Sequence, residues 1–163
     1  DYTSAVARCK HDKVEIKGRH TTSCGFVAAL LEHPMSDEVE KPSGEPALRT
    51  IAMPADTNPA GDIFGGWLLS QMDLAAGVVA RQRARGRTAT VAIDSMVFHK
   101  PVLVGDLVTC YAEVKKVGNT SLTIQVSAWV NRDQTGELMQ VTEGVFTFVA
   151  IGPDGRARLV DGR

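Results

Sequence analysis

The residues most capable of chemistry lie in one short segment before a predicted helix. Asp62 is followed by Gly65 and Gly66. Backbone N–H groups at a helix start have no acceptor within the helix and lie at the positive end of its dipole, so they can stabilise an oxyanion. Glycines at this point let a ligand approach the backbone closely. A carboxylate beside such amides can activate water or attack a carbonyl directly, and these are the two standard routes to acyl hydrolysis.

Each acidic or amide side chain of this region also has an ordinary structural interpretation. Aspartate is a common helix N-cap, and spacing alone favours that interpretation of Asp62. Asp56 and Asn58 are typical turn formers. Asp73 interrupts an apolar helical run, so it needs a partner, water or a function, and we expect a polar contact at the helix interface. It follows Asp62 by 11 residues, about 16 Å along a helix, so the two cannot form a carboxylate pair within one chain.

A second segment, residues 115–121, combines cations, a glycine and hydroxyls in a predicted turn and could hold phosphate groups of a ligand. Its candidate residues are Lys116, Gly118 and Ser121. Lys100, before a proline, and Arg87, at the helix exit, are weaker candidates of the same kind. A solvated hairpin tip is the alternative interpretation of the turn.

Composition and motif content exclude several classes of function. Lys and Arg total 18 against 19 Asp and Glu, a net charge of −1, so no global basic field exists to bind nucleic acid or an anionic membrane. The sequence contains no serine elbow, P-loop, dinucleotide fingerprint or metal-ligand cluster, so we expect neither metal nor cofactor. The three cysteines, an odd number without a CxxC pair, indicate a reducing, cytoplasmic compartment, and Cys110 is interpreted as a buried small hydrophobe.

The elements that must position these residues are one long helix and several strands. Apolar residues at offsets of four, seven and eleven, Leu68, Met72, Ala75 and Val79, predict a helix over residues 67 to about 85, with Gly86 as its stop. A short strand, 48–53, precedes the helix, and four alternating runs follow it: 89–99, 106–117, 121–131 and 138–151. One helix on a curved antiparallel sheet of about five strands is an α+β architecture. Its uncovered face or edge favours a homodimer.

The first part of the chain differs from the rest. Residues 1–46 have mixed charge, no sustained period and a polar stretch with proline and glycine, which predicts an extension or linker outside the fold. Met35 resembles an ordinary protein start, so we expect that the first 34 residues are not needed for folding. Residues 47–163 are predicted to form one domain.

Taken together, the motifs resemble those of the YciA-like branch of the hotdog acyl-CoA thioesterases. The likeness covers residues 48 to 160 and rests on segments 53–58, 61–67, 72–73, 98–101, 104–106, 116–118 and 145–150. It implies a hotdog fold, a long central helix wrapped by the sheet, assembled as dimers and commonly as a trimer of dimers. It also implies metal-independent hydrolysis of acyl-CoA to free acid and CoA. The family's catalytic carboxylate falls on Asp62 and its helix-start amides on Gly65 and Gly66.

The resemblance places active sites at a dimer interface, and several residues are candidates for substrate binding. These are Asn58, Phe64, Asp73, Lys100, Lys116, Gly118 and Ser121. A related thioesterase for aryl-CoA or acyl carrier protein substrates would keep the same chemistry. An acyl-CoA-binding sensor without turnover is the alternative from another class, and it would not need the carboxylate of Asp62. The sequence decides neither the acyl chain length nor whether Asp62 is a general base or a nucleophile.

Overall fold

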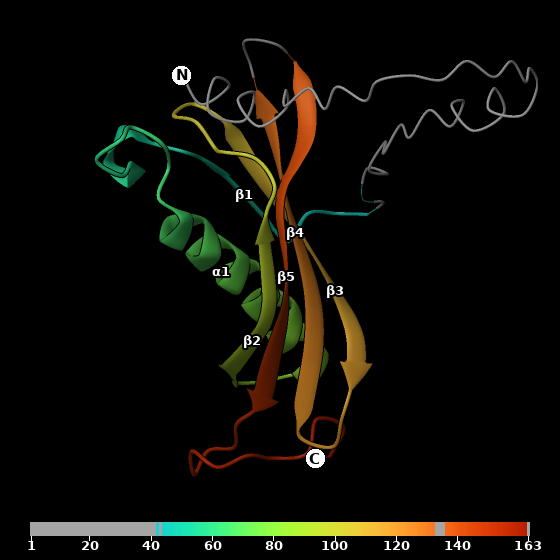
Figure 1. Cartoon of the computed structure of the whole chain (residues 1–163). Helices are drawn as coiled ribbons and strands as arrows, with labels where there is room; N and C mark the ends of the chain where they lie inside the picture. Colours follow the sequence, from blue (N-terminus) through green and yellow to red (C-terminus); the bar gives the residue numbers. More distant parts are fainter. Residues whose placement is uncertain (1–41, 43, 133–135, 163) are drawn as a thin grey trace, which may run out of the picture. The chain divides into compact units, whose positions relative to one another are not determined.

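The computed structural model describes residues 42, 44–132 and 136–162, and it places one long helix against one face of a five-stranded sheet (Figure 1). The elements in chain order are β1 (Leu48–Ile51), the short 3-10 helix η2 (Pro54–Asp56), α1 (Gly65–Ala84), β2 (Thr88–Phe98), β3 (Leu107–Val117), β4 (Ser121–Arg132) and β5 (Glu137–Ala150). The strand order is β1-β3-β4-β5-β2, and each neighbouring pair is antiparallel. The predicted α+β architecture is confirmed, and each predicted end of the long helix and of the five strands lies within two residues of the observed end.

The core lies between α1 and the sheet. In β4 the apolar residues Leu122, Ile124 and Val126 are fully buried while the residues between them are half-buried, as alternation predicts. The helix contributes Leu68 and Met72 and a row of small side chains, Ala75, Ala76, Ala80 and Ala84. These alanines let the helix axis lie close to the strands. Val79, predicted on the buried stripe, is only partly buried because Ala76 and Ala80 occupy the positions nearest the sheet.

The predicted end of the helix needs one correction. Arg85, not Gly86, occupies the left-handed cap position, with φ 50°, and its N–H donates to the carbonyls of Arg81 and Gln82. Gly86 follows, and its N–H donates to the carbonyl of Arg81 at 3.2 Å. Gly86 is therefore not the left-handed cap residue that was predicted, and it lies instead beside the guanidinium of Arg158.

Strand β2 is an edge of the sheet with an unusually apolar exposed surface. Large hydrophobic side chains are exposed along it and on the outer face of α1: Val91, Ile93, Val97, Phe98, Leu74 and Val78. An 11-residue edge strand also presents unpaired backbone groups. Exposed apolar surface of this kind marks a place where another chain can bind.

All of the described elements lie in a single compact unit. None of its helices is both long enough and apolar enough to cross a membrane, over the residues that the structure describes. The predictions about Met35 and residues 1–41 fall outside the described part of the chain. The domain boundary near residue 46 therefore stays a prediction.

Candidate active site

Asp62 lies in a tight loop that Asn58 organises. The side-chain oxygen of Asn58 accepts the N–H groups of Ala60 at 2.9 Å and Asp62 at 3.2 Å. The backbone N–H of Asn58 in turn donates to the carbonyl of Asp62 at 2.7 Å. An asparagine that bonds nearby backbone groups is typical of turns, so the predicted turn-forming role of Asn58 is confirmed. A contact between Asn58 and substrate stays a prediction.

The same loop is fixed at both ends by backbone contacts. Thr57 and Ile63 form an isolated antiparallel bridge, and the N–H of Phe64 donates to the carbonyl of Asp56 at 2.8 Å. The side chain of Ile63 is buried, and its N–H donates to the carbonyl of Val102 at 3.1 Å. These contacts hold Asp62 one residue before a core anchor and three before the helix.

The carboxylate of Asp62 is exposed and makes no hydrogen bond to any residue in the described part of the chain. The N-cap of α1 is Phe64, and no side chain caps the helix. The interpretation of Asp62 as a helix cap is therefore wrong. Its carboxylate is free to contact water or a ligand.

The amides of Gly65 and Gly66 are also unpaired. Helix α1 begins at Gly65, two residues earlier than predicted, so these are its first two N–H groups. The next two, of Trp67 and Leu68, donate to the carbonyl of Phe64 at 2.9 and 3.3 Å. Within the described residues, neither glycine N–H has an acceptor, and the first helical turn has no acidic side chain. The positive end of the helix dipole is thus available to an anion or a polarised carbonyl.

Two exposed aromatic rings flank these amides. A Cβ atom added at Gly65 would lie 3.5 Å from the ring of Phe98, and one added at Gly66 would lie 2.5 Å from the ring of Phe64. The two phenylalanines are 54% and 59% exposed, respectively. Phe64 was predicted to contact substrate. Phe98 was not, because nothing in the sequence indicates that the last residue of β2 lies beside the first residue of α1.

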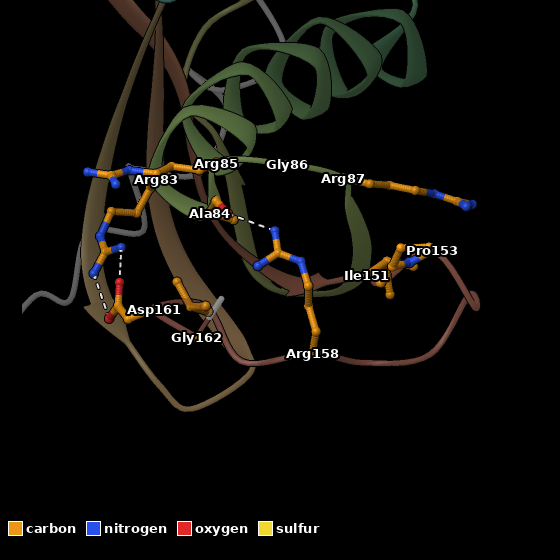
Figure 2. A pocket seen from close by; sticks show the side chains of 12 residues that line it. Arg83, Ala84, Arg85, Gly86, Arg87, Ile151, Pro153, Arg158, Asp161 and Gly162 are labelled. Atoms are coloured by element: carbon orange, nitrogen blue, oxygen red, sulfur yellow. Dashed lines mark hydrogen bonds and ion pairs between the residues drawn. The ribbon is translucent and has the colours of Figure 1, made fainter.

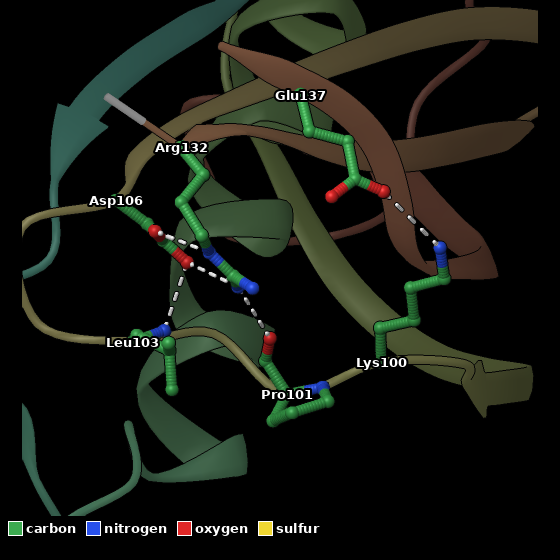
Figure 3. Close-up of polar contacts among 6 residues, drawn as sticks. All are labelled: Lys100, Pro101, Leu103, Asp106, Arg132 and Glu137. Atoms are coloured by element: carbon green, nitrogen blue, oxygen red, sulfur yellow. Dashed lines mark hydrogen bonds and ion pairs between the residues drawn. The ribbon is translucent and has the colours of Figure 1, made fainter. Parts of the chain in front are cut away.

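A buried ion pair supports the loop that holds Ile63. The carboxylate of Asp106, only 3% exposed, accepts bonds from Arg132 at 2.9 and 3.1 Å and from the N–H of Leu103 at 2.9 Å (Figure 3). Arg132 also donates to the carbonyl of Pro101 at 3.3 Å. The hydrogen bonds to Asp106 raise the pKa of Arg132 above its usual value, so the guanidinium remains charged.

Those contacts fix the segment between β2 and β3 at two points, on either side of Val102. The carbonyl of Val102 accepts the N–H of Ile63. The segment is joined to the end of β1 as well, because Gly105 donates to Ala52 and Ala52 donates to Asp106 at 2.8 and 3.0 Å. Asp106 and Arg132 thus form a support for the Asp62 loop. Sequence reasoning placed Asp106 at the start of a strand and within one of the family motifs, but no signal paired it with Arg132.

The remaining predicted residues do not all lie near Asp62 within one chain. Lys100 comes two residues after Phe98, and its ammonium lies 4.0 Å from the carboxylate of Glu137 (Figure 3). Asp73 accepts the hydroxyl of Thr90 at 2.7 Å, which is the predicted polar contact between helix and sheet. The roles of Lys100 and Asp73 in substrate binding stay predictions.

The predicted phosphate-binding turn lies toward the other end of α1. The N–H of Gly118 donates to the carbonyl of Ser121 at 2.8 Å, and Lys116 is exposed at the end of β3. The turn bonds to residues that follow β5, since Val160 donates to the carbonyl of Asn119 at 2.8 Å. Helix α1 has 20 residues, about 30 Å of length, so one chain cannot bring this turn to its own Asp62.

Other chemically capable side chains have a structural explanation. Cys110 is a free, buried thiol, and burial raises its pKa to about 12, so it is not a thiolate nucleophile at neutral pH. His99 lies 3.6 Å from the carboxylate of Glu143, on the exposed surface. No group of side chains suited to holding a metal ion occurs among the described residues.

Comparison with known proteins identifies the family. The model of the thioesterase superfamily matches residues 60–137, which include Asp62 and the start of α1. The acyl-CoA thioester hydrolase YciA of Salmonella typhimurium is 49% identical over 120 residues, covering 72% of this chain and 90% of that protein. The chain belongs to the YciA-like acyl-CoA thioesterases, a family of hydrolases. The resemblance found in the sequence motifs is therefore confirmed.

Solved structures confirm the fold of this thioesterase. A hexameric thioesterase from Yersinia pestis superimposes with a TM-score of 0.71 at 50% identity, covering 76% of this chain and all (100%) of that one. A hexameric hotdog fold thioesterase of Campylobacter jejuni gives 0.68 at 44% identity, covering 71% and 90%. One helix against a five-stranded antiparallel sheet is thus the hotdog fold that the sequence motifs predicted.

Proposed function

We propose that this thioesterase hydrolyses acyl-CoA to the free acid and CoA, with Asp62 as the catalytic carboxylate and the amides of Gly65 and Gly66 as the oxyanion hole. One observation carries the proposal: a carboxylate without a protein partner precedes two helix-start amides that also lack a partner, within the residues described. Charge and hydrogen-bonding capacity are rarely left unused in this way at a helix start unless a ligand or water takes them up.

The proposed reaction needs a nucleophile at the thioester carbonyl and donors for its oxygen. Asp62 can remove a proton from a water molecule as that water attacks, or its carboxylate can attack and form an anhydride that water then hydrolyses. In both routes the C–S bond breaks, CoA leaves as the thiol after protonation, and water supplies the oxygen of the acid. The amides of Gly65 and Gly66 stabilise the negative charge on the carbonyl oxygen, so the proposed route does not require a metal.

The two aromatic rings beside the amides support a site for an extended, largely apolar substrate. Phe64 and Phe98 together expose apolar surface beside the two glycines of the proposed oxyanion hole. An acyl chain or the pantetheine arm would bury these rings on binding, which is favourable in water. Phe64 is therefore proposed as a substrate contact, and so is Phe98, which the sequence did not predict.

We also propose a homo-oligomer, with a dimer as its minimum and a trimer of dimers as its full form. The relatives from Yersinia pestis and Campylobacter jejuni are described as hexameric. Strand β2 supports the dimer, because its exposed edge and its apolar side chains would be covered by a second copy. A cytoplasmic location is part of the same proposal, and the free thiol of Cys110 supports it.

Release of CoA thiol from saturated acyl-CoA esters of graded chain length tests the proposal. We expect turnover of at least part of the series, with all of the released acid matched by free thiol. Tight binding of acyl-CoA without any thiol release would instead identify a sensor and contradict the proposal.

A further inference from the structure

A cleft of about 680 Å³ lies at the C-terminal end of α1, opposite the end that carries the proposed oxyanion hole. The last turn of the helix forms one wall, and the segment after β5 forms the other (Figure 2). Four arginines line the cleft: Arg83, Arg85, Arg87 and Arg158. Such a concentration of guanidinium groups in a concave surface requires an explanation.

Two of the four arginines have protein partners. Arg83 donates two hydrogen bonds to the carboxylate of Asp161, at 2.6 and 3.1 Å. Arg158 donates to the carbonyl of Ala84 at 2.7 Å and so satisfies an acceptor at the helix end. A Cβ atom at Gly86 would lie 2.7 Å from the guanidinium of Arg158, so a larger residue there would require the guanidinium to shift.

The other two arginines, Arg85 and Arg87, have no hydrogen-bond acceptor among the described residues, and both are exposed. Figure 2 shows their side chains extending in opposite directions, with Arg158 between them. Arg85 also has φ 50°, a left-handed conformation that disfavours side chains other than glycine and asparagine. An arginine at a position where glycine would be less strained indicates that its side chain is useful.

The local charge is far from that of the whole chain. Residues 81–87 and 151–162 contain six arginines and two aspartates, a net charge of +4, whereas the chain as a whole carries −1. Cations commonly stabilise the negative end of a helix, and this accounts for arginines within the last turn. It does not account for Arg87, which lies beyond the helix and extends away from the helix end (Figure 2).

We propose that this arginine cleft binds the phosphate groups of a phosphorylated nucleotide. Guanidinium groups match phosphate oxygens in geometry and charge, and the two arginines without a hydrogen-bond acceptor, which extend in opposite directions, suit a ligand with phosphates at two positions. Arg83 and Arg158 add positive potential while their protein contacts hold the walls in place. A nucleotide with several phosphates can come from two sources: the CoA part of the substrate or a free nucleotide.

The first source rests on the proposed function, and the fold constrains it. The cleft and Asp62 of the same chain lie at opposite ends of the 20-residue helix, about 30 Å apart. A substrate whose phosphates occupied the cleft would therefore present its thioester to Asp62 of a second copy. A free nucleotide bound in the cleft would have no such requirement.

Binding of adenosine 3′,5′-bisphosphate, followed by calorimetry on the full chain, tests the proposal without any turnover. The test variant is Arg85→Gly with Arg87→Ala, because glycine relieves the left-handed strain and keeps the helix end folded. The control is Arg49→Ala, which removes an exposed arginine that lies outside the cleft and outside both segments of the charge cluster. We expect the test variant to bind about 100-fold more weakly, about tenfold for each charge-assisted contact, with an unchanged or higher Tm. Equal affinity in wild type and test variant, or no binding to either, would overturn the proposal.

Kinetics on acyl-CoA then distinguishes the two sources. The preference measured is the ratio of kcat/KM for acyl-CoA to kcat/KM for the same acyl group on N-acetylcysteamine. The cleft would be assigned to the substrate's phosphates if the bisphosphate inhibits competitively and the test variant lowers this ratio at least tenfold. Non-competitive inhibition with an unchanged preference would assign it to a free nucleotide. Both results support a phosphate site. If neither thioester is hydrolysed, the proposed function fails, while the calorimetric result still decides whether the cleft binds phosphate.

Discussion

The side-chain oxygen of Asn58 accepts the N–H of Asp62 at 3.2 Å, while the N–H of Asn58 donates to the carbonyl of Asp62 at 2.7 Å. This pair of bonds closes the loop and determines the direction in which the carboxylate of Asp62 leaves the backbone. Asn58 is therefore a positioning residue in the proposed mechanism. A displacement of about 1 Å at a reacting group can lower a rate by about 100-fold.

We expect Asn58→Ala to lower kcat by at least about tenfold while changing KM little, because it removes the acceptor for two backbone N–H groups. Asn58→Asp keeps that acceptor and should recover part of the lost kcat. Steady-state kinetics on one good acyl-CoA substrate measures both. A rise in KM with unchanged kcat would show instead that Asn58 contributes to binding and not to positioning.

Removing one partner of the buried ion pair should destabilise the fold and the site together. Arg132→Ala leaves the buried carboxylate of Asp106 without its cation, so we expect a loss of about 2 kcal/mol in the free energy of unfolding and a lower kcat. Urea denaturation at fixed protein concentration measures the first effect. Lys100→Ala serves as the control for stability, since its ion pair with Glu137 is long and exposed and should change stability by less than about 0.5 kcal/mol.

The two glycines at the helix start should respond differently to alanine. A methyl group at Gly66 would displace the ring of Phe64, whereas one at Gly65 would make an ordinary contact with Phe98. We expect Gly66→Ala to lower kcat/KM by about tenfold and Gly65→Ala to have a smaller effect. Neither should reduce helix stability, because alanine favours a helix more than glycine does. Valine at either position should block approach to the amides. A kcat/KM close to the wild-type value in all four variants would contradict the proposed oxyanion hole.

Cys110 should make stability depend on pH in the alkaline range. Burial raises its pKa from the usual 9.0 to about 12 in the folded protein. The unfolded chain therefore loses the thiol proton at a lower pH than the folded chain does, and stability contributed by the neutral thiol falls as pH rises from about 9 towards 12. Cys110→Ala should show a shallower fall of Tm over that range. Identical slopes for the variant and the wild type would contradict this assignment.

Local patterns predicted most of the fold. The helical spacing of Leu68, Met72 and Ala75 and the alternation in residues 121–131 reflect burial on one face, which leaves a clear period in the sequence. The identity of the cap residue was wrong at both helix ends. Phe64 is the N-cap of α1 and makes no side-chain cap bond, and Arg85 is the C-cap in a left-handed conformation. Both ends also bond to residues outside the helix: the N–H of Phe64 donates to the carbonyl of Asp56, and Arg158 donates to the carbonyl of Ala84.

The candidate site was predicted only where its residues are close in sequence. Asp62, Gly65 and Gly66 belong to one segment, so helix physics alone indicated a shared role. Phe98 and the pair of Asp106 with Arg132 reach the site through strand pairing over long sequence separations. The arginine cleft likewise joins the end of α1 to a segment far along the chain, and Arg158 bonds to Ala84 across 74 residues of sequence. No periodic signal in the sequence predicts such a contact.

Substitution of Asp62 by asparagine tests the central claim most directly. Asparagine has the same size and leaves the loop contacts of the Asp62 backbone in place, but it can neither accept the proton of water nor act as a carboxylate nucleophile. We predict that Asp62→Asn lowers kcat for acyl-CoA by about 10²- to 10⁴-fold, with the same oligomer size by sedimentation and nearly the same affinity for acyl-CoA. Wild-type turnover in Asp62→Asn would contradict the account.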